Sequence, residues 1–227
     1  MPRAKCFLVL GIVLVVFSSQ LAAQSVTTVF EPVADTYLRR GTPNVSHGGS
    51  PVLEVKSSPI NNRVLVRFDL AEVAATLGQG TLVSAELELF VETNGGGWGT
   101  SGRAVDLHRV NMPWTEAGAT WYCADDPMPL NNSPDCSPGW GGGSVEPAVV
   151  ATALHTNDLL GPVRFDLTQE LAALLAAGEH HGWAIERGAG VTSGTVYYAR
   201  AKVRRGGRRS WWWFMSRRAT SSHPCSP

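Results

Sequence analysis

The sequence lacks the patterns that mark the common membrane-spanning and catalytic proteins. Beyond the first 23 residues, no stretch is apolar enough to cross a membrane as a helix of about 20 residues. There is no serine nucleophile elbow, no Cys-His pair, no metal-binding histidine motif and no phosphate-binding glycine loop. We therefore predict no catalytic residue, no metal site and no cofactor, and we expect a protein that is not an enzyme.

Paired carboxylates of the glycosidase type are the one catalytic arrangement that the sequence leaves open, because their geometry has no sequence signature. Glu116 with Asp106 or Glu186 would be that pair.

Charged residues are scarce, at 17% of the chain, and unevenly placed. All 19 acidic residues lie between Glu31 and Glu186, where only nine Arg or Lys residues up to Arg187 oppose them, a net charge of about minus ten. The segment from Arg200 to Arg218 carries eight basic residues and no acidic one. Because an acidic body repels phosphate backbones, we predict that it does not bind nucleic acid.

The first 23 residues have the layout of a secretory signal peptide. Arg3 and Lys5 give a positive start, Phe7 to Phe17 is apolar, and Leu21-Ala22-Ala23 offers small residues for cleavage. A membrane anchor is the alternative, but the apolar run is shorter than the ~20 residues needed to span a bilayer. We predict a secreted, extracellular protein with no membrane contact after the signal is removed.

Cysteine is also rare, with four in the chain. Cys6 lies in the signal, Cys225 has no obvious partner, and Cys123 and Cys136 bracket a polar loop. In an oxidising compartment the sequence predicts a Cys123–Cys136 disulfide, which would remove roughly 3 kcal/mol of chain entropy from the unfolded state.

The same loop concentrates hard oxygen ligands that could favour a structural calcium ion, although they lack the periodic spacing of an EF-hand. These residues are Asp125, Asp126, Asn131, Asn132 and Asp135.

Short apolar and alternating segments separated by Gly, Pro and Asn predict an all-β fold. Val64, Val66 and Phe68 alternate with Leu65 and Arg67, as expected for strands with one buried face. We predict a single jelly-roll-like β-sandwich over residues 24–200. The predicted strands are Val26 to Val33, Asp35 to Leu38, Val52 to Val55, Val64 to Phe68, Val83 to Val91, Ala104 to Val110, Val163 to Leu167, Trp183 to Glu186 and Val196 to Ala199.

An internal repeat predicts one or two short helices. The five residues from Val66 to Leu70 recur identically from Val163 to Leu167, and each copy precedes an Ala/Leu-rich stretch. In both copies the aspartate stands three positions before Glu72 or Gln169, the spacing of a capping box at a helix start.

Exposed aromatic and basic side chains are the candidate ligand contacts. Trp98 and Trp140 lie among glycines in predicted loops, where a large apolar residue packs or binds. Core packing explains Trp114, Trp121 and Trp183, which lie on or beside predicted strands. Basic residues of the early strands would form a site for carboxylate or hydroxyl groups if those strands are neighbours, and solvated strand faces are the alternative. They are Arg39, Arg40, Lys56, Arg63 and Arg67.

Several motifs follow one another in an order that resembles a known family. They are Ala34 to Leu38, Asn44, Gly48-Gly49, Leu53 to Lys56, Arg63, Val66 to Leu70, Ala85 to Leu89, Trp114 to Trp121, the two cysteines, Val163 to Leu167 and Gly182-Trp183. In this order they resemble the DNRLRE-domain proteins, whose carbohydrate-binding members form carbohydrate-binding module family 96. The resemblance implies an extracellular β-jelly-roll and, for some members, polysaccharide binding, with alginate as the associated polymer.

Residues 201–227 depart from that family, because a basic segment and the run Trp211 to Phe214 replace the usual closing strand. We expect this tail to be disordered or the product of a reading-frame shift, since GC-rich codons read out of register give Arg, Trp, Ser, Pro and Cys. A basic, aromatic arm for a membrane, a glycan or nucleic acid is the alternative.

Together these observations predict a secreted, non-catalytic module that attaches to a polysaccharide. The alternative is a structural module of the cell surface or extracellular matrix that binds protein partners.

Overall fold

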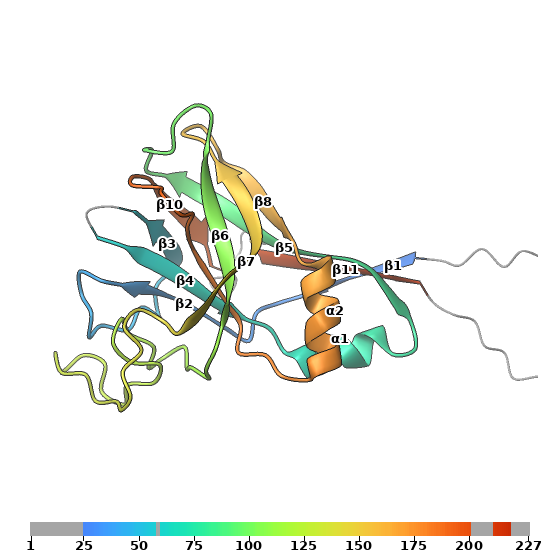
Figure 1. The fold of residues 1–227 in the computed structure, drawn as a ribbon, viewed down its shortest axis with the longest axis horizontal. Coiled ribbons are helices and arrows are strands. Elements are labelled where there is room, and N and C mark those ends of the chain that lie inside the picture. The colour runs from blue at the N-terminus through green and yellow to red at the C-terminus, as the bar shows by residue number, and fades with distance from the viewer. Residues whose placement is uncertain (1–24, 58–59, 201–210, 219–227) are drawn as a thin grey trace, which may run out of the picture.

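The computed structural model describes residues 25–57, 60–200 and 211–218 (Figure 1). The expected signal peptide, Cys6 and Cys225 lie outside these residues. The described elements are the strands β1 Ser25–Phe30, β2 Ala34–Arg39, β3 Val52–Lys56, β4 Asn62–Arg67, β5 Thr81–Asn94, β6 Arg103–Val110, β7 Val145–His155, β8 Gly161–Asp166, β9 Trp183–Arg187, β10 Thr195–Ala199 and β11 Trp211–Arg218, and the helices α1 Leu70–Leu77 and α2 Thr168–Ala177.

The strands join in one bent, antiparallel sheet in the order β1-β11-β5-β10-β3-β4-β9-β6-β7, with β2 also on β4 and β8 also on β5. The bend lies between β3 and β4, which share only the pair of Lys56 with Asn62. The sheet therefore folds over itself into two layers, one built around β5, β8 and β10 and the other around β4, β9 and β6 (Figure 1). This arrangement confirms the predicted all-β, β-sandwich-like domain with two short helices.

The core lies between the two layers and draws on both. Leu87 and Phe165 reach it from one layer, and Val64, Val66 and Ile185 from the other, all of them buried. Burial of alternate strand residues is what the period-two pattern predicts, because successive side chains point to opposite faces.

A smaller core covers part of the outer face of the second layer. Here Leu65 of β4 and Ala184 of β9 pack under Trp114 and Trp140, which belong to the long connection between β6 and β7. We call this connection, residues 111–144, the cystine loop. It buries one half of the outer face of β4 and β9 and leaves the other half open.

The helix predictions were largely correct. Asp69 caps α1, since its Oδ1 accepts hydrogen bonds from the amides of Ala71 (2.9 Å) and Glu72 (3.2 Å). Asp166 differs from its counterpart in the repeat. It accepts from the amide and hydroxyl of Thr168, and no side chain caps the first residue of α2.

Two strands were not predicted. β7 contains Pro147 and three alanines, which disfavour strands, and it lies at an edge of the sheet, where a proline is tolerated. β11 falls in the tail that was expected to be disordered, but residues 211–218 pair with β1 and β5. The rest of the tail lies outside the described residues, and the reading-frame interpretation stays a hypothesis.

Within residues 25–57, 60–200 and 211–218, neither helix has the length and apolar character needed to cross a membrane.

Candidate functional site

The open half of the second layer forms a groove with a volume of about 340 Å³. Its floor is made by β4, β9 and β6, one wall by β7, and the other by the ends of β3 and β4. We call it the sheet groove. Its principal lining residues are Lys56, Asn62, Arg63, Asp106, His108, Pro147, Val149, Glu186 and Arg187.

An ion pair lies in the floor of the groove. Arg63 Nη2 of β4 lies 2.6 Å from Glu186 Oε2 of β9, and the two side chains are 18% and 22% exposed. Burial lowers the pKa of Arg63 below its usual value, and the charge of Glu186 opposes this effect. The pair is thus partly desolvated but still reachable by a ligand.

His108 continues this polar floor on β6. Its Nδ1 lies 3.0 Å and 3.1 Å from the carbonyl oxygens of Glu146 and Ala148 and can donate to them. Its Nε2 then points toward Glu186 Oε1, 3.8 Å away. The backbone of β7 therefore fixes the orientation of the ring.

Asp106 lies directly opposite Glu186 in the β6–β9 ladder. Opposed residues on neighbouring strands have their Cβ atoms about 5 Å apart, so the two carboxylates share one surface. Thr152 donates to Asp106 Oδ1 at 2.7 Å. Carboxylate, guanidinium, imidazole and amide groups thus alternate across three strands, and they can exchange hydrogen bonds with the hydroxyls of a ligand.

The tryptophans proposed as exposed ligand contacts are buried, which corrects that expectation. Trp98 is 0% exposed and its Nε1 donates to the Thr195 carbonyl at 3.0 Å. Trp140 is 8% exposed and its Nε1 donates to the Thr120 carbonyl at 2.9 Å. A buried ring offers no face for a sugar in this conformation.

The glycines around Trp98 and Trp140 are the reason that the sequence predicted exposed rings. A Cβ at Gly194, whose φ is +122°, would lie 2.7 Å from the Trp98 ring. The glycines around such rings let the backbone pack closely against them, so they mark tight packing as well as open loops.

Trp121 packs against the smaller core, as expected, but it also borders the groove. It is only half-buried, and its ring lies against the Arg63 guanidinium, with 5.6 Å between that group and the ring centroid. The cystine loop therefore reaches the edge of the sheet groove and stacks on one of its charged side chains.

The predicted basic cluster is only partly formed. Lys56 and Arg63 line the sheet groove together. Arg39 ends β2 and Arg40 is exposed in the following turn, and neither lines the groove. Arg67 lies over the ring of Trp114, 5.5 Å from its centroid, beneath the cystine loop.

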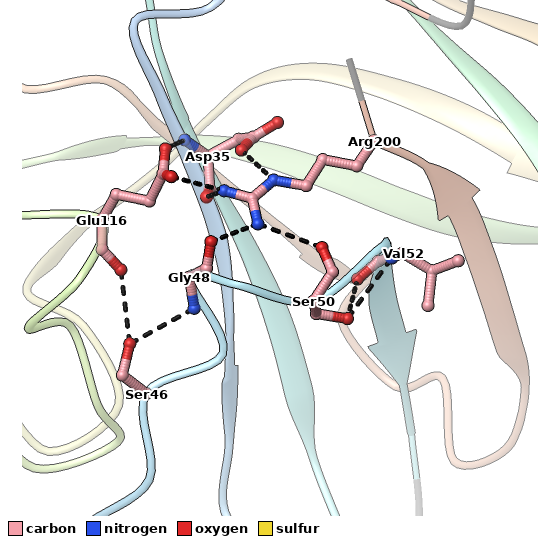
Figure 2. Close-up of polar contacts among 7 residues, drawn as sticks. All are labelled: Asp35, Ser46, Gly48, Ser50, Val52, Glu116 and Arg200. Atoms are coloured by element: carbon pink, nitrogen blue, oxygen red, sulfur yellow. Dashed lines mark hydrogen bonds and ion pairs between the residues drawn. The ribbon is translucent and has the colours of Figure 1, made fainter. Parts of the chain in front are cut away.

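Arg200, the last residue of the predicted domain and the first of the basic segment up to Arg218, forms a buried cluster with Asp35 and Glu116 (Figure 2). Its Nε lies 2.6 Å from Asp35 Oδ1 and its Nη2 lies 2.6 Å from Glu116 Oε1. The same guanidinium also donates to the carbonyls of Gly48 and Ser50. We call Asp35, Glu116 and Arg200 the Arg200 cluster.

The Arg200 cluster joins distant parts of the chain, and Figure 2 shows the carboxylate and carbonyl groups around the Arg200 side chain. Gly48 fits there because a Cβ at this position would lie 2.0 Å from the Glu116 carbonyl oxygen. The Arg200 and Asp35 side chains are 4% and 0% exposed, so a ligand does not reach them. Glu116 therefore has a structural partner in Arg200.

The predicted disulfide is confirmed, since Cys123 and Cys136 are bonded within the cystine loop. The carboxylates proposed as calcium ligands make local bonds there. Asp125 accepts from Thr115 at 2.5 Å, Asp126 from the Met128 amide at 2.9 Å and Asp135 from Asn131 at 2.6 Å. Among the residues that the structure describes, no three His, Cys, Asp or Glu side chains gather as metal ligands would.

Fold and groove together define a disulfide-bonded, β-sandwich-like domain with a polar groove on one open sheet face. Residues 26–133 match the family profile of carbohydrate-binding module family 96, which is consistent with a domain similar to those of this family. The match runs from β1 into the cystine loop and includes Lys56, Arg63, Asp106 and His108 of the groove. No curated protein is significantly similar to the chain.

Proposed function

We propose that this protein is a secreted, non-catalytic module that binds a polysaccharide in the sheet groove. The family match supports carbohydrate binding as the class of function. The disulfide and the signal-like layout of residues 1–23 support secretion, because disulfides persist in oxidising compartments.

We place the binding site in the sheet groove because three neighbouring strands present charged and polar side chains there. Arg63, Glu186 and His108 stand on β4, β9 and β6, and neighbouring strands lie about 4.8 Å apart. These groups therefore offer donors and acceptors over a width comparable to a short piece of a sugar chain. Pro147 and Val149 on β7 add an apolar wall, against which the C–H face of a sugar ring can pack.

The contacts of the two groove carboxylates support binding over hydrolysis. A glycosidase pair needs one carboxyl group that donates a proton and a second that acts as base or nucleophile. Glu186 is held in an ion pair by Arg63, and Asp106 accepts a hydrogen bond from Thr152. Both therefore act as hydrogen-bond acceptors that orient their neighbours.

Retention on immobilised polysaccharides tests the proposal. We expect saturable retention of the folded protein on at least one polysaccharide, and roughly tenfold weaker retention for Arg63→Gln, which loses charge-assisted hydrogen bonds. Arg164→Gln is the matched control, because Arg164 is 52% exposed on the opposite layer and pairs with Glu88.

Two results would reject the proposal. One is folded wild-type protein that is retained on no member of a broad polysaccharide panel. The other is equal retention of the Arg63→Gln and Arg164→Gln variants. Release of reducing ends or unsaturated products from the panel would instead assign an enzymatic role.

A structural role through protein partners is the second candidate, and the position of β7 favours it. This strand is at the edge of the sheet, and its Leu154 is 64% exposed. Edge strands can pair with a strand of another protein. Retention on a cell-envelope protein fraction, lost in Leu154→Lys and unchanged in Arg63→Gln, would support this role over sugar binding.

A further inference from the structure

We propose that the cleft between β7 and α2 binds an extended, basic segment of a partner protein as an additional β-strand. We call it the edge cleft. The proposal does not depend on polysaccharide binding, because no lining residue of this cleft also lines the sheet groove. It extends the second candidate function by giving the edge strand β7 a site and a ligand.

The edge cleft consists of two hollows that both lie between β7 and α2. The first has a volume of about 350 Å³ and is lined by residues 150–152 of β7 and by Asp166, Gln169 and Glu170. The second has a volume of about 270 Å³ and is lined by residues 109–111, 146, 174, 177 and 179–181. Glu170, Leu174 and Ala177 lie three or four positions apart, so one face of α2 borders both hollows.

β7 borders the edge cleft as an edge strand. It ends the strand order of the sheet, and among the described strands it pairs with β6 alone. Edge strands carry free N–H and C=O groups, and an extended peptide can pair with them. Pro147 has no N–H, and the carbonyls of Glu146 and Ala148 lie 3.0 Å and 3.1 Å from His108 Nδ1. We therefore expect the added strand after Ala148, over the residues that border the first hollow.

The length of α2 sets the size of the bound segment. Its ten residues span about 15 Å, because a helix rises about 1.5 Å per residue. An extended chain rises about 3.3 Å per residue, so about four or five of its residues would lie along the helix. Ala177 is exposed at the end of α2 and offers this segment an apolar contact.

The edge cleft has an excess of negative charge. Its carboxylates are Glu146, Asp166, Glu170 and Glu179. Arg109 is the guanidinium that lines it, and its Nε and Nη2 donate to the Glu170 carboxylate at 2.7 Å and 2.6 Å. Four carboxylates against one guanidinium leave three negative charges without a compensating arginine.

The two histidines of the cleft do not reverse this excess. Burial lowers the pKa of His180 to about 4, so its ring is neutral at neutral pH. His181 Nε2 lies 3.3 Å from Glu179 Oε1, and even a protonated His181 would leave the carboxylates in excess. Lysine and arginine side chains of an added strand would therefore be attracted to the cleft, and acidic ones repelled.

Peptide binding to the wild-type protein is the first test. The probe is a labelled synthetic peptide of about eight residues in which valine and lysine alternate, a pattern that suits an extended strand. Fluorescence anisotropy should show saturable binding that weakens several-fold between ~0.05 M and ~0.5 M salt. The same peptide with glutamate in place of lysine should bind at least about tenfold more weakly, because the cleft is acidic.

Methylation of the probe backbone tests strand pairing directly. A version with a methyl group on every amide nitrogen keeps the side chains but loses its N–H donors, so it should bind at least roughly tenfold more weakly. Because the protein is unchanged in this experiment, the result does not depend on the folding of a variant.

Two tryptophan variants of α2 locate the bound peptide. Ala172 and Ala177 are both exposed on this helix, and of the two only Ala177 lines the edge cleft. Ala177→Trp should occupy the second hollow and weaken binding by roughly tenfold, and Ala172→Trp is the matched control that should not. Glu146→Gln combined with Glu179→Gln should weaken binding several-fold, whereas Glu92→Gln on β5, outside the cleft, should leave it unchanged.

The outcomes separate this proposal from polysaccharide binding. Arg63→Gln should bind the peptide as the wild type does, and Ala177→Trp should keep its retention on polysaccharide. Absence of peptide binding, equal binding of the methylated peptide, or equal binding by the two tryptophan variants would each overturn the proposal and leave the sheet groove untouched. Loss of polysaccharide retention in folded Ala177→Trp would assign the edge cleft to the sugar site and also overturn the proposal.

Discussion

Two arginine–carboxylate clusters of similar chemistry occupy very different positions in this domain. In the Arg200 cluster the arginine and Asp35 side chains are 4% and 0% exposed. In the sheet groove the side chains of Arg63 and Glu186 are 18% and 22% exposed. Both ion pairs are 2.6 Å long, so geometry alone does not distinguish them.

The difference between them is what else can reach the charged groups. Arg200 is surrounded by protein acceptors, with the carbonyls of Gly48 and Ser50 beside the two carboxylates. Arg63 has one carboxylate partner, an aromatic ring and an open groove. Burial therefore assigns the first cluster to folding, and accessibility makes the second available to a ligand.

The cystine loop touches both clusters. It supplies Glu116 to the Arg200 cluster and Trp121 to the Arg63 guanidinium. A change in this loop therefore tests whether the folding cluster and the groove depend on each other.

The largest predicted effect comes from the Arg200 cluster. Arg200→Met leaves a buried carboxylate without its cation and should lower the free energy of unfolding by about 3 to 5 kcal/mol. Urea denaturation at neutral pH measures the loss, and Arg200→Lys should recover part of it. A loss below about 1 kcal/mol would show that this cluster behaves like an exposed pair.

The disulfide comes next in expected size. Replacing Cys123 and Cys136 together by Ser should lower the free energy of unfolding by roughly 3 kcal/mol, because the bond restricts the unfolded chain. If the loop also supports the groove, retention on polysaccharide should fall in the double variant under conditions where it is still folded. Unchanged retention would mean that the groove is independent of the loop.

Acidification tests burial at a third polar group, His155, which is 0% exposed beside Trp98 and Tyr198. Burial lowers the pKa of His155 from 6.5 to about 4. As the pH falls below 6.5, His155 therefore binds a proton in the unfolded state but stays neutral in the folded state. Stability should be full above pH 6.5 and fall by on the order of 2 to 3 kcal/mol toward pH 4.

Thermal unfolding across this pH range measures that slope. His155→Gln should flatten it, and the same change at His181, whose side chain is 24% exposed, should not. Part of the slope should remain in His155→Gln, because burial also lowers the pKa of His180 to about 4. A slope that His155→Gln leaves unchanged would contradict the assignment.

The smallest predicted stability effect belongs to the groove itself. Arg63→Gln should change the free energy of unfolding by about 1 kcal/mol or less, since partly exposed ion pairs contribute little. The same variant should lose most of its retention on polysaccharide. A stability loss comparable to that of Arg200→Met would assign Arg63 to folding and remove the contrast between the two clusters.

Much of the fold was predictable because its signals are local. The alternation around Val64 and Val66 identified β4, and the Asp69 spacing identified the start of α1. Leu65 was expected on an outward face, yet it is buried, because the cystine loop folds back over it. β7 was not predicted because Pro147 and its alanines have low strand propensity. Its pairing with β6 makes it a strand, and this pairing has no local sequence signal.

The candidate site was less predictable, because the sheet order assembles it. Lys56 and Arg63 were expected to lie close together, and they share the groove. Asp106, His108 and Glu186 are far from Arg63 in the sequence, and only the neighbouring positions of β4, β9 and β6 bring them to it. Arg200 was placed only at the end of the predicted domain, because the sequence gives no signal for its contact with Asp35, 165 positions away.

The pairing of β1 with β11 has an architectural consequence. Ser25 is opposite Arg218, so the first and last described strands run side by side at one end of the domain, while the β3–β4 hairpin lies toward the other end (Figure 1). Segments fused before Ser25 and after Arg218 would therefore leave the domain at the same end. Such a layout allows circular permutation, with new ends opened in the turn around Arg40.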